Sequence, residues 1–178
     1  MFIEPHGIML LHWWNEVGLL LKAIRDQRIA LFVEIGILHG GLSRILMDQC
    51  VLNPGFRYVG MELDGLNINP QVCEFCDQTP GTSLLVDDAH SDEAVEMVRE
   101  MVRQTTGPAF VYCDGGDKPK EARLYWPTLR PGDFIGVHDY GPVGEPGIEV
   151  FPDDVRQILE EGDLFEMAGT RILMARKR

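Results

Sequence analysis

Acidic side chains follow each of the first five apolar runs of this sequence. Such runs are typical of strands that are buried on both faces of a parallel sheet. Because the carboxyl ends of parallel strands meet at one edge, where ligands bind, we expect these acids to surround one site. Any one of them alone has a simpler interpretation as a helix cap or a turn residue. The residues are Glu34, Glu62, Asp64, Asp87, Asp88, Asp114 and the pair His138-Asp139.

A glycine-containing segment after the first run separates two cofactor classes. Its spacing is Glu34-x-Gly36-x-x-x-Gly40-Gly41. A dinucleotide-binding loop has the pattern G-x-G-x-x-G and holds a pyrophosphate on the amides of a helix N-terminus. Here Leu38 stands in place of the second of those glycines, and a carboxylate lies beside the loop, where it would repel a pyrophosphate. The segment therefore favours a cationic cofactor without phosphate and counts against NAD.

The elements that must position these residues alternate along the chain. Predicted strands cover 29–35, 56–61, 82–86, 108–113, 133–137, 163–168 and 170–175, and predicted helices cover 8–27, 42–50, 69–77, 91–104, 118–129 and 152–161. This alternation predicts an α/β fold, with a mostly parallel sheet and helices on both of its faces. The Gly- and Pro-rich segment 141–147 is interpreted as an active-site loop.

Composition and charge bound the class of protein. The 178 residues are 45% hydrophobic and 25% charged, which is typical of one globular domain over residues 1–178. A total of 16 basic and 28 acidic residues gives a net charge of −12, which disfavours nucleic acid and membrane surfaces as partners. Four scattered cysteines, no signal peptide and no long apolar run predict an intracellular, cytoplasmic protein with reduced thiols.

Three segments of the chain, taken in order, resemble one enzyme class. They are Glu34-Ile-Gly-Ile-Leu-His-Gly-Gly-Leu-Ser43, Asp114-Gly-Gly-Asp117, and Trp126-Pro-Thr-Leu-Arg-Pro-Gly followed by His138-Asp139. On these segments the chain resembles the class I S-adenosylmethionine-dependent methyltransferases, and more narrowly the cephalosporin hydroxylase-like and macrocin O-methyltransferase-like families. The resemblance covers nearly the whole chain. It implies a Rossmann-like methyltransferase fold, in which a seven-stranded sheet is closed by an antiparallel strand.

The resemblance implies S-adenosylmethionine as the cofactor and places residues around it by position. The three glycines of the loop fall where the backbone approaches the methionine part, and Glu34 falls near its ammonium group. Glu62 falls on the acid that binds the ribose hydroxyls, and Asp88-Ala89 falls where the adenine is bound. The full set expected to contact the cofactor is Glu34, Gly36, His39, Gly40, Gly41, Ser43, Glu62, Asp88, Ala89 and Asp114.

The candidate catalytic residues are Asp114, His138 and Asp139, and two mechanisms remain open for them. By resemblance, Asp114 and Asp139 fall on acids that coordinate Mg²⁺ in the macrocin-type enzymes. The sequence departs from those enzymes at Asp117, where their usual histidine is missing. In one mechanism Asp114, Asp117 and Asp139 form an oxygen-rich Mg²⁺ site. In the other, His138 removes the proton of the acceptor.

The predicted function is methylation of a hydroxyl group on a sugar or another small molecule. Amine and nucleobase methyltransferases often carry Asp/Asn-Pro-Pro-aromatic after the fourth strand, whereas this chain has Asp114-Gly-Gly-Asp117. The alternatives are a degenerate methyltransferase fold that binds without turnover and, less favoured, an NAD-linked oxidoreductase. A homodimer is left open. His12-Trp13-Trp14, in the first predicted helix, is interpreted mainly as core packing.

Overall fold

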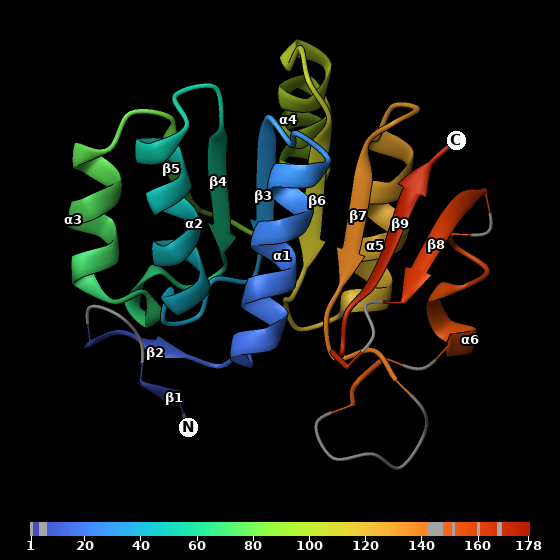
Figure 1. Ribbon diagram of the computed structural model, residues 1–178, viewed down its shortest axis with the longest axis horizontal. Coiled ribbons are helices and arrows are strands. Elements are labelled where there is room, and N and C mark those ends of the chain that lie inside the picture. The colour runs from blue at the N-terminus through green and yellow to red at the C-terminus, as the bar shows by residue number, and fades with distance from the viewer. Residues whose placement is uncertain (1, 4–6, 142–147, 151, 160, 167–168) are drawn as a thin grey trace.

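A twisted seven-stranded sheet forms the middle layer of the molecule (Figure 1). The computed structural model describes residues 2–3, 7–141, 148–150, 152–159, 161–166 and 169–178. The strands are β3 (Leu31–Ile35), β4 (Arg57–Glu62), β5 (Thr82–Val86), β6 (Ala109–Cys113), β7 (Phe134–Val137), β8 (Gly162–Glu166) and β9 (Leu173–Lys177), in the order β5-β4-β3-β6-β7-β9-β8. Strands β3 to β7 pair in parallel, and β9 is antiparallel to both of its neighbours. The predicted sheet with its antiparallel closing strand is confirmed.

Helices cover both faces of this sheet, as predicted (Figure 1). They are α1 (Trp14–Asp26), α2 (Gly41–Leu52), α3 (Pro70–Gln78), α4 (Asp92–Gln104), α5 (Lys118–Tyr125) and α6 (Pro152–Val155), with short 3₁₀ turns at Gly65–Asn67 and Trp126–Thr128. Helices α1, α2 and α3 pack on one face, and α4, α5 and α6 pack on the other. None of the described helices has both the length and the apolar character needed to cross a membrane.

The central strands are buried on both sides, which explains their continuous apolar runs. On β3, Phe32 belongs to the core beneath α1 to α3, whereas Leu31 and Val33 belong to the core beneath α4 to α6. On β6, Tyr112 belongs to the core beneath α1 to α3, and Val111 belongs to the core beneath α4 to α6. Successive side chains of a strand point to opposite faces, so a sheet that is covered twice requires apolar residues at nearly every position.

The first helix is shorter than the sequence predicts, and this correction matters for the site. Helix α1 begins at Trp14, and the preceding Met9–Leu10 is instead strand β2, paired with β1 (Phe2–Ile3). The amide of Trp13 donates to Glu16 Oε2 at 2.8 Å, which closes the first turn of the helix at that point. Alternate residues from Ile8 to His12 are buried, which is the two-residue period of an extended chain.

Smaller corrections fall in the C-terminal half. Helix α5 ends at Tyr125 and continues only as a 3₁₀ turn, because Pro127 cannot supply the amide that the next helical turn needs. The described α6 covers only Pro152–Val155 of the predicted helix 152–161. The last two strands lie at 162–166 and 173–177. Of the predicted active-site loop, residues 142–147 lie outside the described part of the chain.

Candidate active site

A cavity of about 400 Å³ opens at the carboxyl ends of β3, β6 and β7. This is the edge at which the sequence predicts a site, and the cavity is also lined by the segment between β2 and α1, which the sequence does not predict. Its lining residues are Met9, Leu11, His12, Glu34, Gly36, Ile37, Leu38, His39, Gly41, Leu42, Asp114, Gly115, Lys118, His138, Asp139, Glu149 and Arg171. The predicted site residues that line it are therefore Glu34, Gly36, His39, Gly41, Asp114, His138 and Asp139.

The glycines of the first loop allow other parts of the backbone to pack closely against it. Gly36 has a φ of +86°, and a Cβ there would lie 2.6 Å from the carbonyl oxygen of Asp114. A Cβ on Gly41 would overlap the carbonyl of Met9. Gly40, with a φ of +85°, does not line the cavity and packs against Val72. The loop therefore needs glycine to hold β2 and the end of β6 against it, and two of the three glycines also form the cavity wall.

Glu62, at the end of β4, holds the glycine loop in place. Its Oε2 accepts hydrogen bonds from the amides of Ile37 and Leu38, at 3.0 Å and 2.7 Å. Its Oε1 accepts from the amide of Leu63 at 3.1 Å. Leu38 adopts a φ of +51°, which is unusual for a residue that is not glycine, and the bond to Glu62 compensates for it. Glu62 is not among the cavity-lining residues, and its contact with a ribose stays a prediction.

Glu34 forms the inner wall of the cavity as a buried carboxyl with hydroxyl partners. Ser43 Oγ donates to its Oε2 at 2.8 Å, and the Tyr58 hydroxyl donates to the same oxygen. Burial raises the pKa of Glu34 to about 8, because these two neutral donors only partly oppose the loss of water. Ser43 is thus turned toward Glu34. His39 lines the cavity, and its Nδ1 lies 3.2 Å from the carbonyl oxygen of Asn67.

Asp88 and Ala89 lie after β5 and do not line this cavity. Asp88 is exposed, and its Oδ1 accepts from the amide of His90 at 2.8 Å. The carbonyl of Ala89 accepts from the Tyr125 hydroxyl at 2.6 Å. The structure therefore gives these two residues local turn contacts, and their role in adenine binding stays a prediction.

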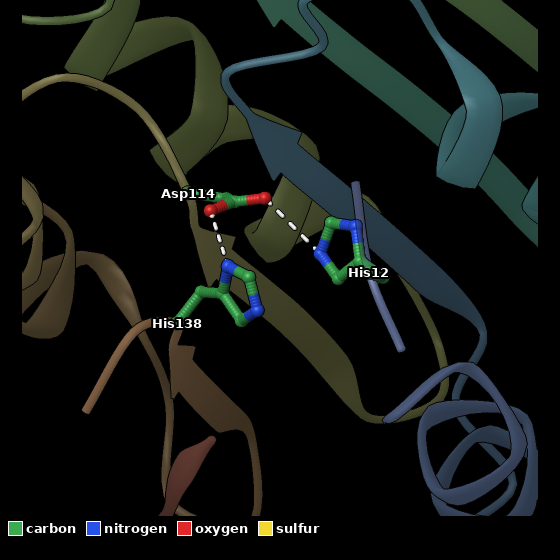
Figure 2. A group of neighbouring side chains, drawn as sticks. All are labelled: His12, Asp114 and His138. Carbon is green, nitrogen blue, oxygen red and sulfur yellow. Dashed lines mark hydrogen bonds and ion pairs between the residues drawn. The ribbon is translucent and has the colours of Figure 1, made fainter. Parts of the chain in front are cut away.

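Three side chains from distant parts of the sequence meet at the outer wall of the cavity (Figure 2). His138 Nδ1 lies 2.8 Å from Asp114 Oδ1, and His12 Nε2 lies 3.1 Å from Asp114 Oδ2. The two imidazole rings stack with their centroids 4.4 Å apart. Tyr112 places its hydroxyl 3.2 Å from His12 Nε2. The carboxylate of Asp114 thus joins two histidines, one from the N-terminal segment and one from the end of β7.

Charged neighbours surround this group. Glu16 is fully buried and accepts from the amides of Trp13 and Arg171, and its Oε2 lies 3.5 Å from His138 Nε2. Asp139, with a φ of +53°, pairs with Arg171 Nη1 at 3.0 Å. Lys118 Nζ lies 3.3 Å from Asp139 Oδ2 and 2.7 Å from Glu149 Oε2. The acids at this wall therefore have cationic partners within direct reach.

These contacts shift the pKa values of His138, Glu16 and Asp114. Burial alone would lower the pKa of His138, but the charge of Asp114 and hydrogen bonds to Asp114 and Glu16 raise it to about 9. Burial opposes ionisation of Glu16, yet hydrogen bonds from His138 and from two amides lower its pKa to about 2. His138 and His12 likewise overcome burial and hold the pKa of Asp114 well below its usual range. Near neutral pH His138 is therefore a cation, which argues against its predicted role as the base.

Of the three acids expected to form an oxygen-rich Mg²⁺ site, only Asp114 and Asp139 line the cavity, and the Mg²⁺ site stays a prediction. Asp117 is exposed, and its Oδ1 accepts from the amide of Lys120 at 3.0 Å, so that it caps the N-terminus of α5. The first amides of a helix need an acceptor, and Asp117 provides one as the N-cap residue of α5. Asp139 forms ion pairs with Lys118 and Arg171.

Sequence reasoning missed His12, Glu16 and Arg171. His12 was assigned to a helix and to core packing, whereas the extended segment before α1 carries it into the cavity. Two signals were present: Ile8, Leu10 and His12 alternate, and Glu16 stands three residues after the N-cap position of Trp13. Nothing local to Arg171 indicates that it would reach Asp139.

No family model matches the chain, and no curated protein matches its sequence. Solved structures match its fold. CmcI has a TM-score of 0.69 at 13% identity, over 98% of this chain and 76% of that one. A putative methyltransferase from Thermobifida fusca has a TM-score of 0.67 at 14% identity, over 92% and 80%. CalS11, a TDP-rhamnose 3'-O-methyltransferase, has a TM-score of 0.64 at 17% identity, over 91% and 78%.

Other matching structures of CmcI contain SAH or Mg and SAM. At identities this low, the likeness concerns the fold. The agreement with CmcI extends over 98% of this chain. The chain therefore has the Rossmann-like fold of the class I S-adenosylmethionine-dependent methyltransferases.

Proposed function

We propose that this protein is an S-adenosylmethionine-dependent methyltransferase that methylates a hydroxyl group on a small molecule. The observation that carries the proposal is the position of the cavity. It lies at the carboxyl ends of β3, β6 and β7 in a methyltransferase fold, beside a glycine loop that lacks the dinucleotide pattern. CalS11, which has the same fold, is a sugar O-methyltransferase by its printed description.

The cavity has groups that fit the methionine end of this cofactor. Helix α2 begins at Gly41 without a side-chain cap, and Gly41 and Leu42 line the cavity, so the amides at that helix end suit a carboxylate. Asp114 also lines the cavity and, as an ionised carboxylate, suits the ammonium and sulfonium cations, whereas the neutral Glu34 carboxyl can accept a hydrogen bond from the ammonium group. Glu62 lies against the same loop, where a shift of its carboxylate would offer both oxygens to a ribose diol.

Bound S-adenosylmethionine supplies a methyl group that is already activated by its sulfonium. The protein must align the acceptor with that methyl group and exclude competing water. Asp114 and His12 line the cavity and are placed to bind an acceptor hydroxyl. In the protein without a bound metal, His138 is held as a cation between Asp114 and Glu16 and keeps the carboxylate of Asp114 ionised and oriented.

A second candidate is a methyltransferase fold that binds the cofactor without turnover. It is favoured by one feature of the site: Asp114 and Glu16 raise the pKa of His138, the predicted base, to about 9. Measuring methyl transfer separately from binding distinguishes this candidate from the first. The homodimer stays a prediction, which light scattering would test.

Calorimetry with S-adenosylhomocysteine and with NAD tests the cofactor. We expect S-adenosylhomocysteine to bind and NAD not to bind. Glu62→Ala should weaken S-adenosylhomocysteine binding about 30-fold to 1000-fold, the effect of two charged hydrogen bonds. Glu74→Ala, on the exposed side of α3, is the matched control and should change nothing. Tighter binding of NAD than of S-adenosylhomocysteine would overturn the proposal.

Methyl-labelled S-adenosylmethionine tests the acceptor. Incubation with panels of sugars, phenols and amines should label hydroxyl compounds and leave amines unlabelled. Label on amines alone would contradict the oxygen assignment. Tight cofactor binding with no labelled product in any panel would favour the second candidate.

A further inference from the structure

The group at the outer cavity wall is chemically different from the site that the sequence predicts. It contains two imidazoles and one carboxylate, from the β2–α1 segment, the end of β6 and the end of β7 (Figure 2). We propose that His12, Asp114 and His138 bind a divalent first-row transition metal ion such as Zn²⁺, and that this protein does not use Mg²⁺ there. The choice of ion rests on these three side chains and not on the fold.

The geometry brings one ligand atom from each residue to the same place. One ligand atom from each of His12, Asp114 and His138 lies within 4.8 Å of the other two. Ligands of a tetrahedral Zn²⁺ stand roughly 2.1 Å from the ion, which places them about 3.4 Å from each other. Both rings already direct a nitrogen at Asp114 (Figure 2). Small side-chain rotations would therefore complete the three contacts.

The choice of metal follows from the donor atoms. Mg²⁺ requires oxygen ligands in octahedral geometry, whereas imidazole nitrogen suits Zn²⁺ and its neighbours in the first transition row. Asp139 is the second carboxylate that Mg²⁺ would need. It is held by Arg171 Nη1 at 3.0 Å and by Lys118 Nζ at 3.3 Å, and two adjacent cations oppose a bare Mg²⁺ at that oxygen pair.

A carboxylate behind one of the ligands is an independent observation in favour of the site. The second ring nitrogen of His138 faces Glu16 Oε2 at 3.5 Å. Glu16 is fully buried and is fixed by the amides of Trp13 and Arg171. Histidines that bind metals commonly donate their other N–H to a carboxylate, which orients the ring and strengthens the ligand. Glu16 and His138 have this arrangement.

The ion would face the cavity, because all three ligands line it. An open coordination position toward the cavity is the mark of a catalytic rather than a structural site. The catalytic role of the ion rests on the proposed function, whereas the binding of the ion does not. A hydroxyl acceptor bound to the ion would lose its proton more readily, because a metal lowers the pKa of a coordinated oxygen.

Metal titration of the chelator-treated protein, without cofactor, tests the binding. We expect one equivalent of Zn²⁺ to bind, with Mg²⁺ at least about 100-fold weaker. His12→Ala and Asp114→Asn should each weaken Zn²⁺ binding by about 100-fold or more, and Glu16→Gln by about 10-fold to 100-fold. His90→Ala is the matched control, because His90 also lies within 4 Å of two carboxylates but outside the cavity. It should leave Zn²⁺ affinity unchanged.

A measurement on the unsubstituted protein keeps the test valid where a variant fails to fold. In ¹⁵N spectra of histidine side chains, Zn²⁺ should shift His12 Nε2 and His138 Nδ1, and Mg²⁺ should shift neither. Equal affinity for the two ions, or Zn²⁺ shifts at other histidines, would overturn the proposal. S-adenosylhomocysteine binding is measured separately, so failure of the metal site and failure of the proposed function give different results.

Discussion

Two buried carboxyl groups, Glu34 in the lining of the cavity and Glu16 behind His138, differ in charge state. Glu34 and Glu16 are equally inaccessible, at 1% and 0% exposure. The pKa of Glu34 is about 8 because burial dominates over two hydroxyl donors, whereas the pKa of Glu16 is about 2 because His138 and two amides overcome burial. Burial therefore does not decide whether an acid in this protein is charged. The decisive factor is whether a cation and aligned amides face it.

The difference divides the cavity into two parts. The wall beside the glycine loop carries a neutral carboxyl at physiological pH. The other wall carries an ionised network of Asp114 and Asp139 with His138, Lys118 and Arg171, and Glu16 pairs with His138 from behind this wall. A cationic cofactor and a polar acceptor would thus meet different electrostatic surroundings in one cavity.

The largest expected effect is on stability, from removal of Glu16. Glu16→Ala leaves the buried Nε2 of His138 and the amides of Trp13 and Arg171 without the acceptor that Glu16 provides, while Asp114 still pairs with Nδ1, so we expect a loss of about 3–5 kcal/mol in the free energy of unfolding. Urea denaturation at pH 7 measures it. Glu100→Ala, which removes an exposed pair with Arg103, is the control and should cost less than about 1 kcal/mol. Equal losses in the two variants would erase the contrast between buried and exposed pairs.

The next effect is a pH dependence that belongs to Glu34. Its pKa rises from the ordinary 4.5 to about 8 on folding, so the folded protein retains a proton that the unfolded chain loses. The associated stability is complete below about pH 4.5 and is lost as the pH rises to 8. Glu34→Gln keeps the shape and cannot ionise.

Unfolding of both proteins across this pH range tests the assignment of a neutral Glu34. The stability of Glu34→Gln relative to the unsubstituted protein should increase by about 2–4 kcal/mol from low to high pH. Identical pH profiles would mean that Glu34 is ionised in the folded protein, and the two walls would then be alike.

A smaller effect sharpens the comparison at the charged wall. In the metal-free protein the raised pKa of His138, about 9, contributes stability that is present below its ordinary 6.5 and is lost as the pH rises through 9. Glu16→Gln removes one of the acids that raise it, and should lower the midpoint of the His138 titration by about one pH unit. NMR titration of the ring protons measures this. A midpoint that does not move would assign the raised pKa of His138 to Asp114 and Asp139.

The smallest effect concerns the neutral wall. Tyr58→Phe removes one of the two hydroxyl donors to Glu34 and should cost about 0.5–1.5 kcal/mol at pH 6, where Glu34 is protonated. Thermal unfolding measures the change. A cost as large as that of Glu16→Ala would show that Glu34 carries a charge that depends on Tyr58.

Most of the fold follows from patterns that are local in the sequence. The predicted strands 29–35 and 108–113 and the predicted helix 91–104 nearly match the observed Leu31–Ile35, Ala109–Cys113 and Asp92–Gln104, because buried strands and amphipathic helices impose their own periods. The glycine loop and the acids after the strands are local signals too, and several of them do line the cavity. The helical spacing of apolar residues predicts a helix from residue 8, which is wrong for 8–13. That segment is extended, and its apolar residues run directly into those of the helix that begins at Trp14.

The sequence by itself determined the sheet, its helices and the edge at which the cavity lies, because each depends on neighbours within a few positions. Only the tertiary structure decided which residues meet there and in what charge state. His12 reaches Tyr112, and Glu16 reaches His138 and Arg171, across more than 95 residues of chain. Asp117 and Asp114 are both acids after β6, yet one caps a helix and the other joins two histidines. The physical reason is that a carboxyl group responds to the atoms that surround it, and those atoms come from segments that only folding brings together.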